Sequence, residues 1–357
     1  MSLSEKVRLY QYAGNMNQIM GARRVRIEGG TAGDMLLTEV KTGSGLEFSV
    51  LEDKCLDIYD LRYKGVNLAY FCKNGLVRGE RASIVPGEFM KLFTGGGMFT
   101  CGLMNVMAFC EDEDGTQFQK HGAAQHRQAE QAYVKQGFEG DEYRIEMGGK
   151  VSESRVLGYH LQLTRTIETK GFSNTVTIRD RIDNLDGSPE GTQMCYHMNL
   201  GYPFIDVGSY ALFPKGNQVE ALTPSADLSE SYAVMPAPIV GGAEMVAINR
   251  MPPDTNGMNR VLVVNDKLKL GILVECAQDT LPVVCLWKCP HAGDYVMGIE
   301  PTNAFGNRMD ARKNGTLAMI EPYGHMDFLF RFTVLEGREL EEAKNFFDSE
   351  MPKTKNN

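Results

Sequence analysis

The fold class is decided by the stretch Thr175-Val176-Thr177-Ile178-Arg179-Asp180-Arg181-Ile182, in which the apolar residues are all separated by even numbers of positions. Val176, Ile178 and Ile182 therefore fall on one face of an extended chain, and the two arginines fall on the other. This alternation predicts a β-strand that is buried on one side only.

The same period of two recurs on both sides of this stretch. Leu161, Leu163 and Ile167 also fall on one face of an extended chain. Residues 261–264 and 268–274 lie on either side of Asn265-Asp266, a pattern that predicts two strands joined by a tight turn. Strands without alternating helices argue against a parallel sheet. The sequence therefore predicts an all-β chain folded as a large antiparallel β-sandwich.

Helical patterns are confined to the two ends of the chain. Residues 1–20 are expected to form a helical extension, and residues 338–350 place their apolar side chains on one stripe of a helix. No repeat or linker divides the sequence between them. We therefore expect a single domain over residues 1–357, with short helices at its termini.

Composition narrows the functional classes. The 357 residues carry a formal net charge of -9, which argues against nucleic acid or an anionic membrane surface as a partner. No apolar run reaches the length of a membrane span, and the N-terminus lacks a secretory signal pattern. The eight cysteines are scattered among apolar residues, which is typical of reduced, buried thiols. We expect a cytoplasmic protein whose partner is a small, neutral molecule.

Two patterns suggest phosphate or metal binding, and neither is complete. Gly95-Gly96-Gly97 lacks the lysine and the hydroxyl residue of a phosphate-binding loop. Cys285 and Cys289 with His291 have neither the spacing nor the fourth ligand of a zinc site. The expectation is therefore that the protein uses no metal and no cofactor.

A histidine and a glutamate each lie in an apolar frame. His197 lies within Cys195-Tyr-His-Met-Asn-Leu200, and Glu300 lies within Gly298-Ile-Glu-Pro301. Taken alone, the histidine fits a buried core residue better than a catalyst. Glu321 repeats the apolar-Glu-Pro form and is a rival for any role given to the glutamate.

Three motifs, in this order, resemble the signatures of the aldose 1-epimerase (galactose mutarotase-like) superfamily. They are His121-Gly122, Tyr196-His197-Met198-Asn199-Leu200 and Gly298-Ile299-Glu300-Pro301-Thr302-Asn303. Two earlier segments, residues 45–58 and 96–105, are similar to a divergent branch of the superfamily. The resemblance covers residues 20 to 335, and it implies the galactose mutarotase-like supersandwich with a sugar site on the concave face of one sheet.

The resemblance also implies the roles of three residues. His197 would protonate the ring oxygen of a sugar, Glu300 would take the proton of the anomeric hydroxyl, and His121 would help to hold the sugar. Both proton-transfer groups suit this chemistry, because histidine titrates near neutrality and burial raises the pKa of a carboxyl group. Glu300 is preferred to Glu321 because Thr302-Asn303 continues the family pattern after it.

Further contacts with the sugar are expected from four residues. Lys54 and Asp57 match a basic and an acidic residue that the branch resemblance places near the site, and ordinary turn charges are the alternative. Arg127 lies in the polar segment after the first motif and also fits a solvated surface arginine, and Asn199 belongs to the second motif. Trp287, the only tryptophan, fits core packing better than sugar stacking.

The sequence thus predicts an isomerase, similar to aldose 1-epimerase, that interconverts the anomers of an unidentified free sugar by opening its ring. The alternative is a non-catalytic carbohydrate-binding protein that uses the same cleft. Tyr196 stands where the family usually has asparagine, and Pro301 follows the glutamate, so the motifs do not identify the sugar. None of them bears on the oligomeric state.

Overall fold

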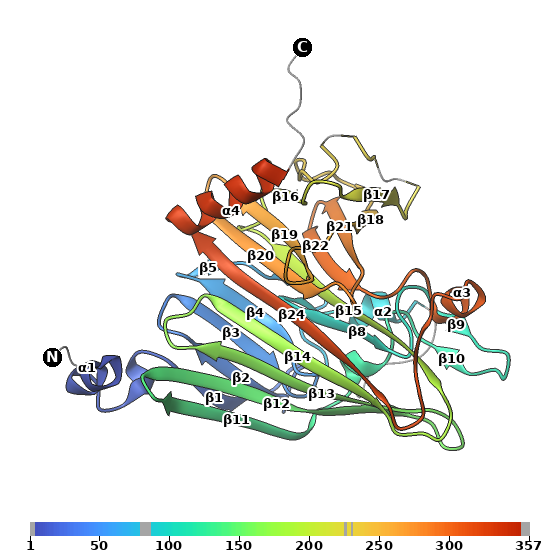
Figure 1. The fold of residues 1–357 in the computed structure, drawn as a ribbon, viewed down its shortest axis with the longest axis horizontal. Helices are drawn as coiled ribbons and strands as arrows, with labels where there is room; N and C mark the ends of the chain where they lie inside the picture. The colour runs from blue at the N-terminus through green and yellow to red at the C-terminus, as the bar shows by residue number, and fades with distance from the viewer. Residues whose placement is uncertain (1–3, 79–86, 225–226, 230, 351–357) are drawn as a thin grey trace, which may run out of the picture.

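The computed structural model describes residues 4–78, 87–224, 227–229 and 231–350. Within these ranges, three large antiparallel sheets hold most of the strands, and the helices are short (Figure 1). The prediction of an all-β antiparallel sandwich with short helices is confirmed.

The largest sheet has eight described strands in the order β11-β12-β13-β14-β24-β20-β19-β16. Their bounds are Glu130–Glu139, Glu142–Ser154, His160–Lys170, Thr175–Asn184, His325–Glu336, Leu270–Ala277, Met258–Asn265 and Tyr210–Leu212. The stretch that decided the fold class lies in β14, with Val176, Ile178 and Ile182 fully buried. The expected hairpin is formed by β19 and β20, in which Val264 lies opposite Gly271.

The second large sheet carries the candidate site. Its described strands follow the order β17-β18-β21-β22-β15-β23, and β8 pairs with β15 on the edge opposite to β22. Their bounds are Gln218–Ala221, Met245–Arg250, Val283–His291, Asp294–Thr302, Glu190–Gly201 and Ala318–Ile320, with Phe99–Leu103 for β8.

The third large sheet is built from the N-terminal part of the chain in the simple order β1 to β5. Its strands span Gly21–Arg26, Leu36–Lys41, Leu46–Leu51, Asp57–Tyr63 and Val66–Asn67. Two further pairs of short strands are β6 (Tyr70–Phe71) with β7 (Gly95–Gly96), and β9 (Cys110–Glu111) with β10 (Gln117–Phe118).

The core lies where the eight-stranded sheet packs against the two other large sheets (Figure 1). Tyr196 of β15 stacks its ring on that of Phe330 of β24, with 5.0 Å between the ring centroids. Arg165 of β13 pairs with Asp180 of β14 at 2.6 Å and reaches Asp57 of β4 at 3.5 Å. These contacts join all three sheets through buried side chains.

The helices lie at the edges of the sandwich. Their bounds are α1 Glu5–Tyr12, η1 Met16–Gln18, α2 Phe89–Leu92, η3 Ala124–His126, α3 Arg308–Lys313 and α4 Gly337–Glu350. Of the helical extension expected over residues 1–20, residues 1–3 lie outside the described ranges, and α1 and η1 occupy part of the rest. The C-terminal α4 packs Leu340 and Phe347 against the eight-stranded sheet. Among the described helices, none is both long enough and apolar enough to cross a membrane.

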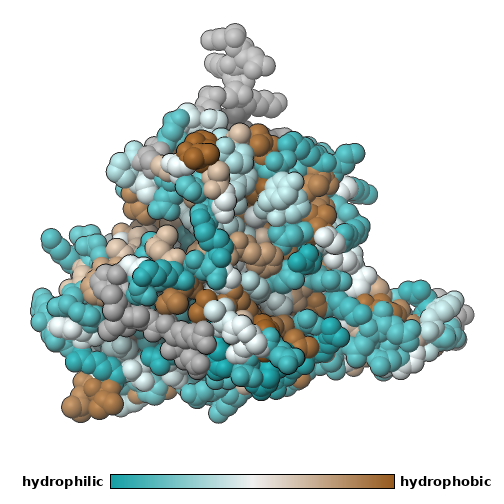
Figure 2. Space-filling view, turned by 180° about the vertical axis from the view of Figure 1, so that it is seen from behind, coloured by the Kyte–Doolittle hydropathy of each residue, from teal (hydrophilic) through white to brown (hydrophobic). Residues whose placement is uncertain are grey.

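The exterior is mostly polar on the side opposite to the view of Figure 1. Figure 2 shows this side, where hydrophilic residues predominate and hydrophobic residues gather in small groups between them. Most of the large apolar side chains are instead buried inside the protein.

Candidate functional site

His197 and Glu300 lie directly opposite each other on neighbouring strands. The register of β15 and β22 pairs Met198 with Ile299, and it therefore places His197 beside Glu300. Because side chains alternate along a strand, Met198 and Ile299 enter the core while His197 and Glu300 project from the other face of the sheet. Strand pairing thus brings together two motifs that are far apart in the sequence.

A cavity of about 430 Å³ lies over this pair. Small-molecule sites usually measure roughly 300–1,000 Å³, so the cavity has room for one small ligand. It is lined by Gly87, Phe89, Met90, Phe93, Val106, Met107, Ala108, Phe109, Lys120, His121, Cys195, His197, Leu222, Glu244, Val246, Cys285, Trp287, Glu300 and Thr302. Most of this lining is apolar, and few polar side chains reach it.

The histidine and the carboxyl group are in contact but are not aligned as a hydrogen bond. Nε2 of His197 lies 3.1 Å from Oε1 of Glu300, and both residues are only 7% exposed. Nδ1 of His197 and Oε1 of Glu300 have no hydrogen-bond partner in the described structure. Buried polar atoms normally have partners, so this pair is suited to exchanging protons and hydrogen bonds with a bound polar group.

Burial sets the protonation state of the pair. It raises the pKa of Glu300 to about 8, with a further increase from the charge of Glu244 and an opposing effect of Lys120. It lowers the pKa of His197 to about 3. These two shifts favour a protonated carboxyl group and a neutral imidazole at neutral pH.

His121 joins the pair from a loop that follows β10. Its ring lies 5.9 Å from the ring of His197 and nearly perpendicular to it, and 4.9 Å from the ring of Phe89. Two backbone hydrogen bonds fix the loop, because the N–H of His121 donates to Met107 and its carbonyl accepts from Gly102. Burial holds the pKa of His121 well below its usual value, so it enters the cavity as a neutral imidazole.

Lys54 and Asp57 lie in and just after the turn between β3 and β4, outside the cavity lining. Asp57 is buried between the sheets, where Oδ1 accepts hydrogen bonds from the N–H and the hydroxyl of Thr100. The ammonium group of Lys54 is also buried and donates to the carbonyl of Val77 at 3.4 Å. Both side chains are thus engaged inside the protein rather than directed at the cavity.

The remaining residues expected at the site also lie outside the cavity lining. Arg127 is exposed. Asn199 is buried on β15, two residues after His197, and its side-chain amide donates to the carbonyl of His197 at 3.0 Å. Glu321, the rival of Glu300, lies exposed in the turn between β23 and β24. Of the residues proposed from the sequence, the structure brings His121, His197 and Glu300 to one cavity.

The sequence-based prediction missed Lys120 and Glu244 as cavity residues and assigned Trp287 to core packing. Trp287 forms part of the wall, with its ring 5.3 Å from that of His197, and its Nε1 donates to Glu244 at 2.9 Å. Lys120 holds its ammonium group 5.5 Å from the ring centroid of Phe89. Strand alternation offers a signal for Trp287, because Cys285, two residues earlier, pairs in register with Glu300.

Metal ligands are not grouped in the part of the chain that the structure describes. No three His, Cys, Asp or Glu side chains there are arranged as they would be around a metal ion. Cys285 and Cys289, the cysteines of the incomplete zinc pattern, are both free thiols on β21.

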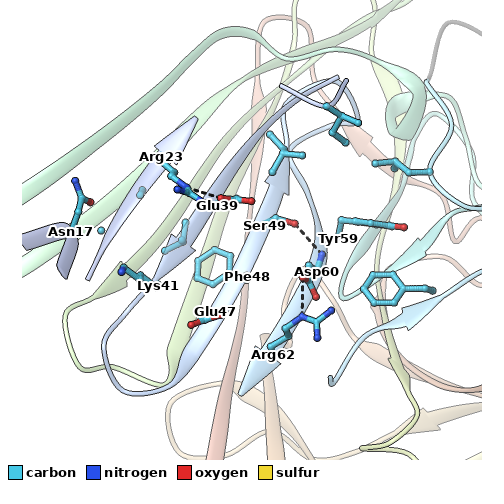
Figure 3. Close-up of a pocket in the computed structure, with 17 residues that line it drawn as sticks. Asn17, Arg23, Glu39, Lys41, Glu47, Phe48, Ser49, Tyr59, Asp60 and Arg62 are labelled. Atoms are coloured by element: carbon cyan, nitrogen blue, oxygen red, sulfur yellow. Dashed lines mark hydrogen bonds and ion pairs between the residues drawn. The ribbon is translucent and has the colours of Figure 1, made fainter. Parts of the chain in front are cut away.

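A larger concave surface lies elsewhere, on the five-stranded sheet. It encloses about 840 Å³, and its charged side chains largely pair with one another. Figure 3 shows Arg23 bonded to Glu39 and Arg62 bonded to Asp60, at 2.7 and 3.0 Å. No histidine is among the described residues that line it. Despite its size, this groove therefore offers no acid and base pair comparable to that of His197 and Glu300.

Comparison with known proteins identifies the family. Residues 33–334 match the model of a family described as a domain of unknown function, DUF4432. A search of the curated proteins finds no match.

Solved structures with a similar fold include sugar epimerases. One, described as a "putative aldose 1-epimerase" from Klebsiella pneumoniae, has a TM-score of 0.87 and 20% sequence identity, over 96% of this chain and 92% of that one. A galactose mutarotase-like protein from Clostridium acetobutylicum has a TM-score of 0.62 and 12% sequence identity, over 90% of this chain and 100% of that one. A galactose 1-epimerase from Lactobacillus acidophilus has a TM-score of 0.57 and 11% sequence identity, over 89% of this chain and 100% of that one. At these identities the likeness shows the fold, which is the galactose mutarotase-like sandwich.

Proposed function

Because the chain belongs to the DUF4432 family, a domain of unknown function that here has the galactose mutarotase-like fold, we propose that it is an aldose 1-epimerase-like isomerase acting on a free sugar. The observation that carries this proposal is the pairing of His197 with Glu300 in a cavity whose lining is mostly apolar. Two adjacent proton-transfer groups of opposite function are what anomer exchange requires.

The reaction needs an acid that donates a proton to the sugar and a base that accepts a proton from it. An acid protonates the ring oxygen O5 while a base removes the proton of the hydroxyl on C1, and the bond between C1 and O5 breaks to leave an open-chain aldehyde. The aldehyde rotates about the bond between C1 and C2, and O5 then attacks the other face of C1. Both protons return to their original groups, so the enzyme ends the cycle unchanged.

We assign the acid to Glu300 and the base to His197 in the ring-opening step. The carboxyl group holds the proton at neutral pH and the imidazole is neutral, for the reasons of burial given above. Ring closure reverses both transfers. This assignment exchanges the two roles that the family resemblance implied, while it keeps the same two residues.

The sugar would be held by the walls above this pair. The indole ring of Trp287 presents an apolar surface on which the C–H face of a pyranose can stack, and His121 offers a neutral ring nitrogen for a hydroxyl group. Lys54, Asp57 and Arg127 are left out of the proposed site because they do not line the cavity.

The reduced state of the cysteines supports a cytoplasmic setting as part of the proposal. All eight are free, and seven of them are buried. A cytoplasmic isomerase of free sugars would not need disulfides, and it would not meet an oxidising environment.

Exchange spectroscopy of sugar anomers by NMR tests the function. We expect the wild-type protein to accelerate exchange between the α and β anomers of at least one sugar in a panel of hexoses and pentoses. Fluorescence of Trp287, the only tryptophan, reports binding in the same cavity. A sugar that binds without faster exchange would favour the non-catalytic carbohydrate-binding protein, and a panel without binding would reject both.

A further inference from the structure

Much of the wall of the cavity is apolar. The side chains that form it come from α2, from the loop after β8 and from β18. They are Phe89, Met90, Phe93, Val106, Met107 and Val246. None of these side chains can donate a hydrogen bond or accept a strong one.

The polar side chains of the lining are few, and some are already engaged. The hydroxyl of Thr302 donates to the carbonyl of Met194 at 2.8 Å and accepts from the N–H of Ala304 at 3.0 Å. Glu244 accepts from Trp287. These engaged groups can serve a sugar hydroxyl only by giving up a bond that they already make.

The other polar side chains of the lining lie near the proposed reaction centre. His197 and Glu300 are assigned to the oxygens O1 and O5, which leaves His121 and Lys120 in addition to the engaged side chains of Thr302, Glu244 and Trp287. A hexopyranose carries four further hydroxyl groups. A hydroxyl that is taken out of water without a partner costs free energy, so the apolar wall selects against a sugar that is fully hydroxylated.

We propose that the substrate is a deoxy sugar, in which the carbon farthest from the anomeric centre carries a methyl group instead of a hydroxyl group, as in the 6-deoxyhexoses. This proposal rests on the proposed function, because it takes the positions of O1 and O5 from His197 and Glu300. The methyl group would pack against the wall that Phe93 and Val246 help to form.

A carboxylate at the same position is the main competitor, because Lys120 could pair with it. Two features disfavour that pairing. The ammonium group of Lys120 lies over the ring of Phe89, and Glu244 brings a negative charge to the same cavity. A uronic acid would add a second negative charge and would lose its own hydration.

Three sugars that differ only at C6 give a direct test. D-Fucose, D-galactose and D-galacturonate carry a methyl, a hydroxymethyl and a carboxylate group there, and 6-deoxyglucose, glucose and glucuronate form a second series. Trp287 fluorescence measures binding of each sugar, and NMR exchange measures its turnover. In at least one series we expect the deoxy sugar to bind about tenfold more tightly than its hydroxylated partner, a ratio that corresponds to about 1.4 kcal/mol, with the carboxylate weakest.

The outcomes separate the two proposals. If sugars bind or exchange but the hydroxylated form equals or exceeds the deoxy form in both series, the deoxy inference is wrong while the isomerase proposal stands. If the carboxylate binds best, Lys120 is its partner and the inference is also wrong. If the deoxy sugar binds best without any exchange, the inference holds for a binding protein and the isomerase proposal fails. If no sugar binds, both fail.

Discussion

Glu300 combines deep burial with a position beside an imidazole, and both affect how the rate should depend on pH. The pKa of its carboxyl group is raised to about 8, while that of His197 is lowered to about 3. Between these values the acid is protonated and the base is free. We therefore expect the exchange rate, corrected for exchange without protein, to fall as the pH rises through about 8 and to stay constant from pH 7 down to pH 5. A corrected rate that increases through pH 8 would indicate that the ionised carboxylate is the active form.

The same carboxyl group should reduce the stability of the protein at alkaline pH. Its pKa in the folded state is raised from the ordinary value of 4.5 to about 8, so its contribution to stability is complete below pH 4.5 and is lost progressively as the pH rises from there to about 8. Glu300→Gln removes this ionisation. We expect the Tm of the variant, relative to wild type, to increase from pH 5 to pH 9, where a gain of about 1 kcal/mol corresponds to roughly 2–4 °C. A difference in Tm that does not change with pH would show that the pKa is not raised.

Strand β22 makes room for the catalytic carboxyl group through a glycine. A Cβ atom on Gly298 would lie 2.5 Å from Oε1 of Glu300 and 3.0 Å from Cβ of Trp287. We expect Gly298→Ala to displace one of these side chains and to lower the exchange rate by about tenfold to a hundredfold, as small displacements of reacting groups do. Gly14→Ala is a matched control, because nothing lies within 4 Å of a Cβ there. Equal rates for both variants would contradict the proposed placement of Glu300.

Strand alternation explains how much of the site was predictable. The second and third motifs lie on β15 and β22, where alternate residues leave the core, so His197 and Glu300 reach the same face once the strands pair. The sequence does not reveal which strands become neighbours, and the family resemblance supplied that information. Lys54 and Asp57 could not be placed from the sequence, because their burial depends on how the N-terminal sheet packs against the others.

The three large sheets are held together by a buried ionic group. Arg165 is fully buried, bonds to both carboxylate oxygens of Asp180 and also donates to the hydroxyl of Thr100. Removing one partner of a buried pair leaves a charge without compensation, which costs about 3–5 kcal/mol. We expect Arg165→Met to lower the free energy of unfolding in urea by this amount, and Arg23→Ala, which breaks an exposed pair with Glu39, by at most about 1 kcal/mol. Equal effects would show that the buried pair is not needed.

These contacts between sheets also support our proposal that residues 1–357 form a single domain. If the sheets depend on one another, urea should unfold the wild-type protein in one transition that is the same by circular dichroism and by Trp287 fluorescence. Two separate transitions would show that the chain contains units that unfold independently. The class of the fold could be predicted from the period of two in residues 175–182. The order of the strands could not, because alternation determines which face of a strand is buried but not which strands become its neighbours.

The central claim is that His197 and Glu300 exchange protons with a sugar, and anomer exchange in matched variants tests it most directly. With the best substrate of the wild-type protein, we expect His197→Asn and Glu300→Gln each to lose about 10²–10⁴-fold in exchange rate while sugar still quenches or enhances Trp287 fluorescence. Glu321→Gln, a change of the exposed rival, should keep the wild-type rate. Full activity in Glu300→Gln, or loss of activity in Glu321→Gln alone, would contradict the assignment.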